Sequence, residues 1–408
     1  MADYDDIADL TIELGESRNE FNDLAGAYFG LRQELSSRWW TRSGAGTPHE
    51  LASQMREALA GERADLADYW YFPSGKHNPY LDLLYAELPA HGLRVRELPS
   101  FDELPLLVSN CTLHLHWTQS LRPNGSDAEQ NQQALDRAKR LLRAFKAGEG
   151  NKLIWSVHEP LPHGSLWPAQ DADFHQFLCD TADVIHILHP STVQVCAEYF
   201  HIDEAKTVLV EHPLYTGVYS SYRSRSSARA LLGIAPDELC VVFFGAIRAY
   251  KGIDRLLEAT GTAATQRRLR LLIAGMPVGE VQDLQARVDA HPEASAAAML
   301  VPDSEIQTLL GAADVLVIPY QRFLNSAVVM LALSFGVPVI ATENPVTTTA
   351  RSSGLVSTYT TLDELVAELA GAVVDPHVEL DAQFALDHAA TKISDDFARA
   401  LRSQLWSD

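Results

Sequence analysis

A loop after a buried strand carries two cations just ahead of a predicted helix. The segment GAIRAYKGIDRLLEA places Gly245, Arg248 and Lys251 between the apolar run LCVVFFG and a helix that we expect to open near Gly252. Backbone N–H groups at a helix N-terminus, joined by an arginine and a lysine, form a binding site for a diphosphate. A solvated basic turn is the alternative for this loop taken alone.

Further strand ends in the same half of the chain strengthen the anion site. The run RLLIAG ends at Gly275, just before Pro277, and the run DVLVIPY ends at Tyr320. Asn325 and Ser326 precede an apolar run, where we expect them to cap a helix whose free N–H groups face the cleft. Because ligands bind at the carboxyl ends of parallel strands, these loops are predicted to converge on one anion.

Histidines mark two strand ends in the first half of the chain. The run TLHLHW places His114 and His116 on one face of a strand, and KLIWSVHEP ends in His158 and Glu159. An imidazole or a carboxylate at such a position is suited to act as general base on an acceptor hydroxyl, so His158 and Glu159 are the catalytic candidates. A hydrogen-bonded core or loop residue is the alternative for each histidine.

The acceptor side of the site is expected nearby. Lys76 and Asn78 follow an earlier strand in PSGKHNPY, and together with His116 they are the candidates for acceptor contacts. His114 and His116 have no evident third ligand, so no metal site is predicted.

The elements that must position these residues follow a βα alternation. From Asp68 onward, the short apolar runs DYWYFP, LRVREL, TLHLHW, KLIWSV, DVIHIL and TVLVEH alternate with helical patterns, and LCVVFFG, RLLIAG, AAAMLV, DVLVIP and VPVIAT form a second set. This alternation predicts two Rossmann-like, doubly wound parallel sheets. We expect an N-terminal domain over 67–212, a C-terminal domain over 213–384 and a terminal helical segment over 385–408.

The first 66 residues are predicted to form a helical extension. Apolar residues from Ile7 to Leu35 follow a heptad-like seam, which predicts a helix that either packs on its own domain or pairs two copies into a homodimer.

The segment 128–147 is predicted to form a basic amphipathic helix with Arg137, Lys139, Arg140, Arg143 and Lys146. It would contact an anionic membrane surface or, alternatively, cover the sheet with a solvated basic face.

Composition sets the class of partner. The 408 residues contain 32 Lys+Arg and 54 Asp+Glu, a net charge of −22, so a general nucleic-acid binder is not expected. The N-terminus shows no signal peptide and no apolar stretch reaches about 18 residues, which predicts a soluble cytoplasmic protein, with the inner face of the membrane as an alternative location. The four cysteines are spaced as reduced, buried thiols.

The second half resembles the donor domain of GT-B-fold glycosyltransferases of the family 4 type (glycosyltransferase group 1). The resemblance rests on GAIRAYKGIDRLLEA, RLLIAG, SEIQTLLGAADVLVIPY and ALSFGVPVIATENP, and it covers about Thr207 to Asn344. It implies a GT-B fold, a nucleotide diphosphate sugar, UDP- or GDP-linked, as donor substrate without a further cofactor, and diphosphate contacts by Arg248 and Lys251. It also implies that His158 contacts the donor sugar and that the final helix crosses back onto the first domain.

One departure from the family is clear. Where its members carry two glutamates before the turn at Gly336, this chain has Phe323 and Leu331. The second glutamate normally binds the donor ribose, so the resemblance leaves ribose recognition and stereochemistry open. The LNS loop is similar to that of bacterial polysaccharide-assembly transferases.

The predicted function is transfer of a hexose to a hydroxyl of a glycan, a lipid-linked glycan or another acceptor, without a metal. One alternative is a non-catalytic glycosyltransferase-like subunit that binds a glycan or stabilises a partner, which the two missing glutamates favour. Another is a nucleotide-sugar 2-epimerase on the same fold.

Overall fold

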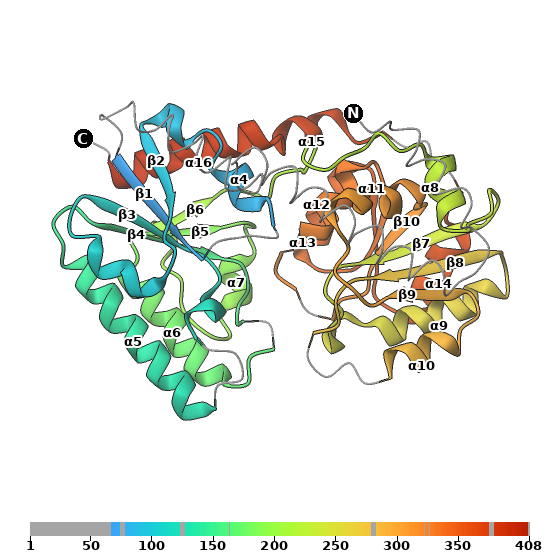
Figure 1. The fold of residues 1–408 in the computed structure, drawn as a ribbon, viewed down its shortest axis with the longest axis horizontal. Helices are drawn as coiled ribbons and strands as arrows, with labels where there is room; N and C mark the ends of the chain where they lie inside the picture. Colours follow the sequence, from blue (N-terminus) through green and yellow to red (C-terminus); the bar gives the residue numbers. More distant parts are fainter. Residues whose placement is uncertain are drawn as a thin grey trace, which may run out of the picture.

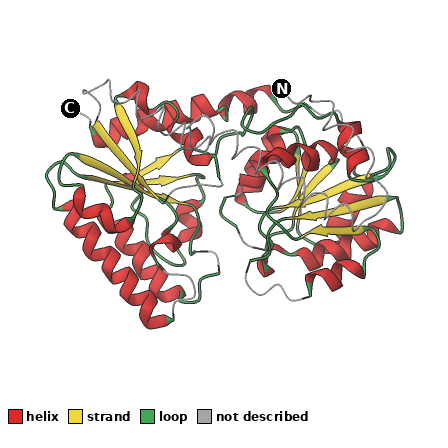
Figure 2. Ribbon diagram, viewed as in Figure 1, coloured by secondary structure: helices red, strands yellow, loops and turns green. Residues whose placement is uncertain are grey.

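The chain forms two α/β domains side by side, each built on a parallel sheet (Figures 1 and 2). In the computed structural model, the described residues are 67–73, 78–122, 127–162, 164–278, 283–321, 323–325, 327–374 and 379–406. The predicted helical extension over 1–66, with its seam at 7–35, lies outside them.

The first sheet has the strand order β2-β1-β3-β4-β5-β6, with every neighbouring pair parallel. Its strands are β1 (Ala67–Phe72), β2 (Leu93–Glu97), β3 (Cys111–Leu115), β4 (Lys152–Val157), β5 (Val184–Ile187) and β6 (Thr207–Leu209). Its helices are α4 (Tyr80–Tyr85), α5 (Ala128–Lys146), α6 (Pro168–Thr181) and α7 (Thr192–Cys196), with 3₁₀ turns η1 (Leu88–His91), η2 (Phe101–Leu106), η3 (Thr118–Leu121) and η4 (Glu204–Lys206). The central strands β3, β4 and β5 are mainly apolar and almost wholly buried because helices cover both faces.

The second sheet has the order β12-β11-β10-β7-β8-β9 and is also parallel. Its strands are β7 (Leu239–Phe244), β8 (Leu269–Ala274), β9 (Ala294–Ala297), β10 (Val315–Ile318), β11 (Val339–Thr342) and β12 (Val356–Tyr359). Its helices are α8 (Arg225–Leu231), α9 (Ile253–Ala264), α10 (Leu284–Asp289), α11 (Asp303–Ala312), α12 (Ala327–Ser334), α13 (Pro345–Ala350), α14 (Leu362–Gly371) and α15 (Ala382–Asp387), with 3₁₀ turns η5 (Ala249–Lys251) and η6 (Arg351–Ser353).

Two edge strands of this sheet differ from the sequence prediction. The run AAAMLV was expected to be a strand, but β9 lies earlier, because Ala294–Ala297 pair with β8 and the chain then leaves the sheet with Leu300 exposed. β12 was not predicted, since VSTY mixes polar and apolar residues at the opposite edge. Edge strands have one neighbour, so their hydrophobic pattern is weaker.

The chain crosses between the domains twice. The first crossing follows β6, and the second leads from α15 to α16 (Ala390–Leu405), which lies across the first domain (Figure 1). The Leu214 N–H donates to the His388 carbonyl at 2.8 Å, which ties the two crossing segments together. On α16, Phe397 is fully buried and the Ser394 hydroxyl donates to Leu84 O at 2.8 Å, so the last helix belongs structurally to the first domain.

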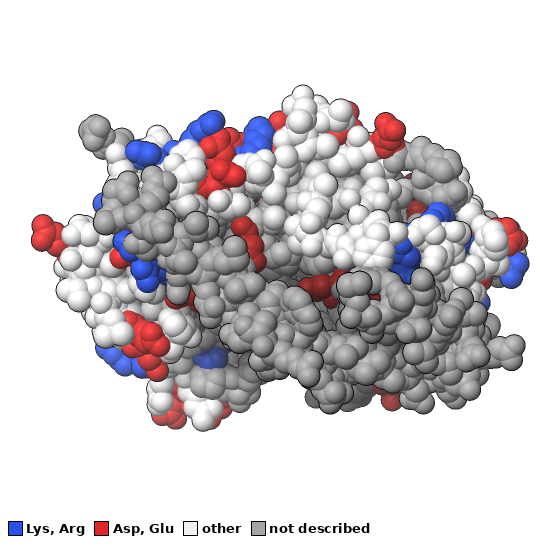
Figure 3. All heavy atoms as spheres, turned by 45° about the horizontal axis from the view of Figure 1, so that its top comes forward, with Lys and Arg blue, Asp and Glu red and all other residues white. Residues whose placement is uncertain are grey.

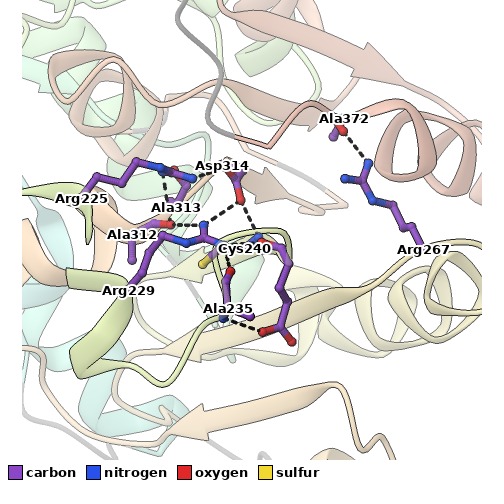
Figure 4. A network of polar contacts seen from close by, with 10 residues as sticks. Arg225, Arg229, Ala235, Cys240, Arg267, Ala312, Ala313, Asp314 and Ala372 are labelled. Carbon is purple, nitrogen blue, oxygen red and sulfur yellow. Dashed lines mark hydrogen bonds and ion pairs between the residues drawn. The ribbon is translucent and has the colours of Figure 1, made fainter. Parts of the chain in front are cut away.

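A buried ionic cluster fastens α8 to the second sheet (Figure 4). Asp314, just before β10, is almost fully buried and accepts from Arg225, from Arg229 Nη1 at 3.0 Å and from the Cys240 N–H at 2.7 Å. This cluster sits at the amino ends of β7 and β10, away from the strand ends that carry the predicted site.

The basic helix α5 makes its charge contacts mainly within its own domain. Three of its cations pair with acidic residues and a fourth lies over an aromatic ring: Arg137 with Asp102, Lys139 with Asp173, Lys146 with Asp183 and Arg143 over Phe177. On the described part of the face shown in Figure 3, acidic and basic side chains are interspersed. The pairings on α5 favour its interpretation as a sheet-covering helix over that of a membrane anchor.

Candidate active site

The loop after β7 is shaped by two glycines in close contact. Gly245 has φ +114°, and a Cβ on Gly275 would lie 1.9 Å from the Gly245 carbonyl oxygen, so neither position tolerates a side chain without a backbone shift. The Ile247 N–H donates to Met276 O at 2.8 Å, and Ile247 forms an isolated bridge with Pro277. The loops after β7 and β8 therefore form one unit at the carboxyl edge of the sheet.

Lys251 is a buried cation held against a phenol. Lys251 is only 9% exposed. Its Nζ donates to the Tyr320 hydroxyl at 3.1 Å and lies 4.5 Å from the centre of the Tyr320 ring. Burial and the neighbouring Arg248 lower the pKa of Lys251 to about 8. Within the described part of the chain no carboxylate pairs with it, so the site holds positive charge that an anion would neutralise.

The helix beyond the loop begins where the sequence predicts. α9 starts at Ile253 after Gly252, whose φ is +69° and whose absent Cβ leaves room for Pro319 O at the end of β10. The short turn η5 carries Lys251 back under the loop, a detail that the sequence did not indicate. Because Gly252 lets β10 approach, the loop after β7 and Tyr320 after β10 meet around the lysine.

The first domain contributes His158 and Glu159 at the end of β4. His158 is half-buried, stacks on Trp117 with ring centres 4.6 Å apart, and shares a 2.9 Å hydrogen bond between its Nε2 and His116 Nδ1. Glu159 is buried. Burial raises the pKa of Tyr250, in the second domain, to about 12, with the charges of Arg248 and Glu159 acting on it from the two sides of the cleft.

Direct contacts join the two halves of the site. Asn325 Nδ2 donates to His158 O at 3.1 Å, and His189 Nε2 lies 2.9 Å from Thr349 Oγ1. Arg248 reaches Gly164 of the first domain, since a Cβ there would be 3.6 Å from its Nη1. The loops that carry Arg248 and Asn325 therefore lie against the loops that follow β4 in the first domain.

Other predicted site residues fall in different places. Asn78 Oδ1 accepts from the Tyr80 N–H at 3.0 Å and from the Tyr215 hydroxyl at 3.2 Å, so it links the start of α4 to Tyr215, 137 residues further along the chain. His116 is 1% exposed and hydrogen-bonds to His158, so its side chain lies in the interior of the first domain; the sequence could not show how deeply the end of β3 is buried. Lys76 and Ser326 lie outside the described residues.

The two residues that stand where the family carries glutamates, Phe323 and Leu331, make apolar packing contacts. Phe323 packs edge-on against Tyr320 with ring centres 5.5 Å apart, and Leu331 is buried in α12. Neither can bind a ribose hydroxyl.

Sequence reasoning missed the buried polar side chains behind His158. Tyr69, Tyr85, Ser156 and His186 lie on strands or helices whose apolar pattern gave no reason to single them out. Across the described ranges, no three His, Cys, Asp or Glu side chains cluster as metal ligands, and no helix is long and apolar enough to cross a membrane. The four cysteines are buried and unpaired.

Comparison with known proteins gives the context of this cleft. Residues 238–375 match the family model described as glycosyl transferases group 1. GDP-mannose:glycolipid 4-beta-D-mannosyltransferase of Xanthomonas campestris pv. campestris is 26% identical over 279 residues, covering 66% of this chain and 71% of the relative. A D-inositol 3-phosphate glycosyltransferase of Saccharomonospora viridis is 30% identical over 169 residues, covering 38% and 39% of the two chains.

Solved structures share the two-domain architecture. HepE of Anabaena, crystallised with UDP-glucose, superposes with a TM-score of 0.61 at 14% identity and covers 82% of this chain and 99% of its own. A glycosyltransferase from Rickettsia africae gives a TM-score of 0.55 at 11% identity, over 85% and 100% of the chains. The chain therefore has the GT-B fold, and its second domain is similar to group 1 glycosyltransferases over residues 238–375.

Proposed function

We propose that the protein transfers a hexose from a UDP- or GDP-linked donor to a hydroxyl group of a glycan or glycolipid, without a bound metal. The observation that carries the proposal is the buried Lys251 beside Arg248, with a phenol as the lysine's hydrogen-bond partner. A nucleotide diphosphate supplies the two negative charges that such a pair of cations would neutralise.

The chemistry then divides between the two domains. Arg248, Lys251 and the N-terminus of α9 would stabilise the diphosphate as negative charge develops on it during cleavage of the bond to the sugar. Glu159 and His158, from the end of β4, face this group and supply the donor-sugar contact and the base that takes the proton of the acceptor hydroxyl. A glycolipid acceptor is favoured because the relative from Xanthomonas is named for one.

A donor panel tests the proposal. The full chain is incubated with UDP- and GDP-linked hexoses and with lipid-linked and simple sugar acceptors, and the products are analysed by mass spectrometry. We expect a mass increase of one hexose on at least one acceptor, with release of one nucleoside diphosphate. Donor turnover without any acceptor would instead indicate an epimerase.

The missing carboxylates at Phe323 and Leu331 favour a second candidate, a non-catalytic subunit that keeps the fold. Thermal-shift measurements with UDP, GDP and their sugars separate the two. Stabilisation by one nucleotide below millimolar concentration is expected of the enzyme, whereas a transition temperature unchanged by all of them would favour the subunit.

A further inference from the structure

A continuous chain of hydrogen bonds runs from the half-buried His158 through buried side chains to the backbone of Val210, directly after β6. Its side chains all lie in the first domain. On the cleft side, His158 Nε2 lies 2.9 Å from His116 Nδ1, His116 Nε2 lies 2.5 Å from the Tyr85 hydroxyl, and that hydroxyl lies 2.9 Å from His114 Nδ1. On the far side, His114 Nε2 lies 2.7 Å from Ser156 Oγ, Ser156 Oγ lies 2.7 Å from His186 Nδ1, and His186 Nε2 lies 3.0 Å from Val210 O. A neutral imidazole donates from one ring nitrogen and accepts at the other. The order of donors and acceptors along the chain is therefore the same at every ring.

The carbonyl at the far end sets that direction. Val210 O can only accept, so His186 carries its hydrogen on Nε2 and accepts through Nδ1 from the Ser156 hydroxyl. Ser156 has one hydrogen, so its oxygen accepts from His114 Nε2. Burial lowers the pKa of His186 to about 4 and that of His114 well below its usual value, so both rings are neutral at pH 7.

Two phenols then compete for one lone pair. His114 Nδ1 is an acceptor, and the hydroxyls of Tyr69 and Tyr85 lie 2.7 and 2.9 Å from it. Tyr69 is fully buried, and over the described residues His114 is the acceptor that its hydroxyl meets with hydrogen-bond geometry. The Tyr85 hydroxyl lies closer to His116 Nε2, at 2.5 Å, than to His114 Nδ1, at 2.9 Å, so we assign the Tyr69 hydrogen to His114 and the Tyr85 hydrogen to His116.

The direction continues to the cleft. His116 accepts through Nε2, and burial and its histidine neighbours keep it neutral by holding its pKa well below the usual value, so its hydrogen is on Nδ1 and points at His158 Nε2. A hydrogen on that atom of His158 would face the hydrogen of His116. We propose that this chain fixes His158 in the Nδ1–H tautomer, making Tyr69, Tyr85 and His116 positioning residues for the cleft.

The consequence deepens the proposed function, on which it rests for the role of His158. With its Nε2 occupied, His158 acts toward the substrates as a hydrogen-bond donor through Nδ1–H. The proton of the acceptor hydroxyl then goes to Glu159, the other candidate at the end of β4. The tautomer itself depends on no substrate, so it can be measured separately from transfer.

Long-range ¹H–¹⁵N spectra of the full chain, labelled with ¹⁵N-histidine and recorded at pH 7 without donor, give the tautomers directly. Signals are assigned from the loss of each peak in single His→Gln variants. We expect His114 and His186 to be protonated on Nε2, and His116 and His158 on Nδ1. A His158 ring protonated on Nε2, or on both nitrogens, would overturn the proposal.

One conservative substitution should reverse the chain. In Tyr69→Phe, His114 Nδ1 loses the donor that Tyr69 supplied, so the Tyr85 hydroxyl donates to it instead. His116 then donates from Nε2 to the Tyr85 oxygen, and His158 donates from Nε2 to His116 Nδ1. We expect the His158 signal to switch to the Nε2–H form. Tyr80→Phe is the matched control, because the Tyr80 hydroxyl is buried among the same rings and has no hydrogen-bond partner among the described residues. An unswitched His158 in a folded Tyr69→Phe protein would contradict the mechanism.

Discussion

Two buried cations of the second domain, Arg229 and Lys251, have opposite surroundings. Arg229 is 5% exposed at the amino ends of the strands, where Nη1 donates to Asp314 Oδ2 at 3.0 Å and to Ala312 O at 3.1 Å (Figure 4). Lys251 is similarly buried at the carboxyl ends, where its partner is the neutral Tyr320 hydroxyl. Both lie in one domain, so the difference reflects which end of the sheet they occupy.

This difference separates a structural charge from a binding charge. A buried cation that meets a carboxylate and several carbonyls is satisfied within the folded protein, and removing one partner leaves an uncompensated charge. A buried cation that meets only a neutral group carries unrelieved desolvation, which a bound anion relieves. We therefore expect the Asp314 cluster to contribute stability and Lys251 to contribute anion affinity, and the following measurements test this difference.

The largest effect is expected on stability in Asp314→Ala. The change removes the carboxylate that Arg225 and Arg229 share, so the free energy of unfolding should fall by ~3–5 kcal/mol in urea titrations. Asp237→Ala is the control, because its pair with Arg268 is exposed and should contribute less than ~1 kcal/mol. Equal losses in the two variants would contradict the structural role of the cluster.

The next effect is on transfer in Lys251→Met. Losing one preorganised cation at the leaving group should lower kcat/KM by about 100-fold or more, measured by product formation under single-turnover and steady-state conditions. The melting temperature of the unliganded variant should not fall, because the change removes a desolvated charge. Lys392→Met, on the surface of α16, should leave kcat/KM unchanged. A fully active Lys251→Met enzyme would remove the donor site from this loop.

The smallest effect is a pH dependence of donor binding. Burial lowers the folded-state pKa of Lys251 to about 8. Below that pH, the unliganded protein keeps a protonated lysine buried, which costs free energy, and this cost is relieved as the lysine loses its proton above pH 8. A bound diphosphate favours the charged form. Donor KM should therefore rise above pH 8, by up to about tenfold per pH unit, with proton uptake on binding in calorimetry.

A lysine-to-arginine change sharpens this last measurement. Arginine stays protonated throughout, so Lys251→Arg should bind donor more weakly at neutral pH but lose the rise in KM between pH 8 and 9.5. If the rise persists unchanged in that variant, it comes from another group.

The sequence predicted the fold well where strands are buried on both sides. β7 and β10 are central, so their apolar runs are continuous and unambiguous. The shift of β9 and the unpredicted β12 occur at the edges, where one partner strand sets the register and the local pattern is weak.

The site was predictable only where it is local in sequence. The placement of Arg248 and Lys251 between β7 and α9 was predictable because a strand, a glycine turn and a helix are adjacent along the chain. The phenol of Tyr320 against Lys251 joins residues 69 positions apart, and the bond from Asn325 to His158 O spans 167. No spacing rule encodes such pairings, because they depend on how two sheets and two domains are brought together.

The tied crossing segments restrict how the two halves of the cleft can move. Both connections run close together, and the bond from the Leu214 N–H to His388 O joins them. Two connections joined at one point form a single pivot, which restricts sliding of one domain along the other more than rotation about that point. A rotation about this pivot that separates the domains at Asn325 would break its bond to His158 O, so opening the space between the domains would also release a contact at the end of β4.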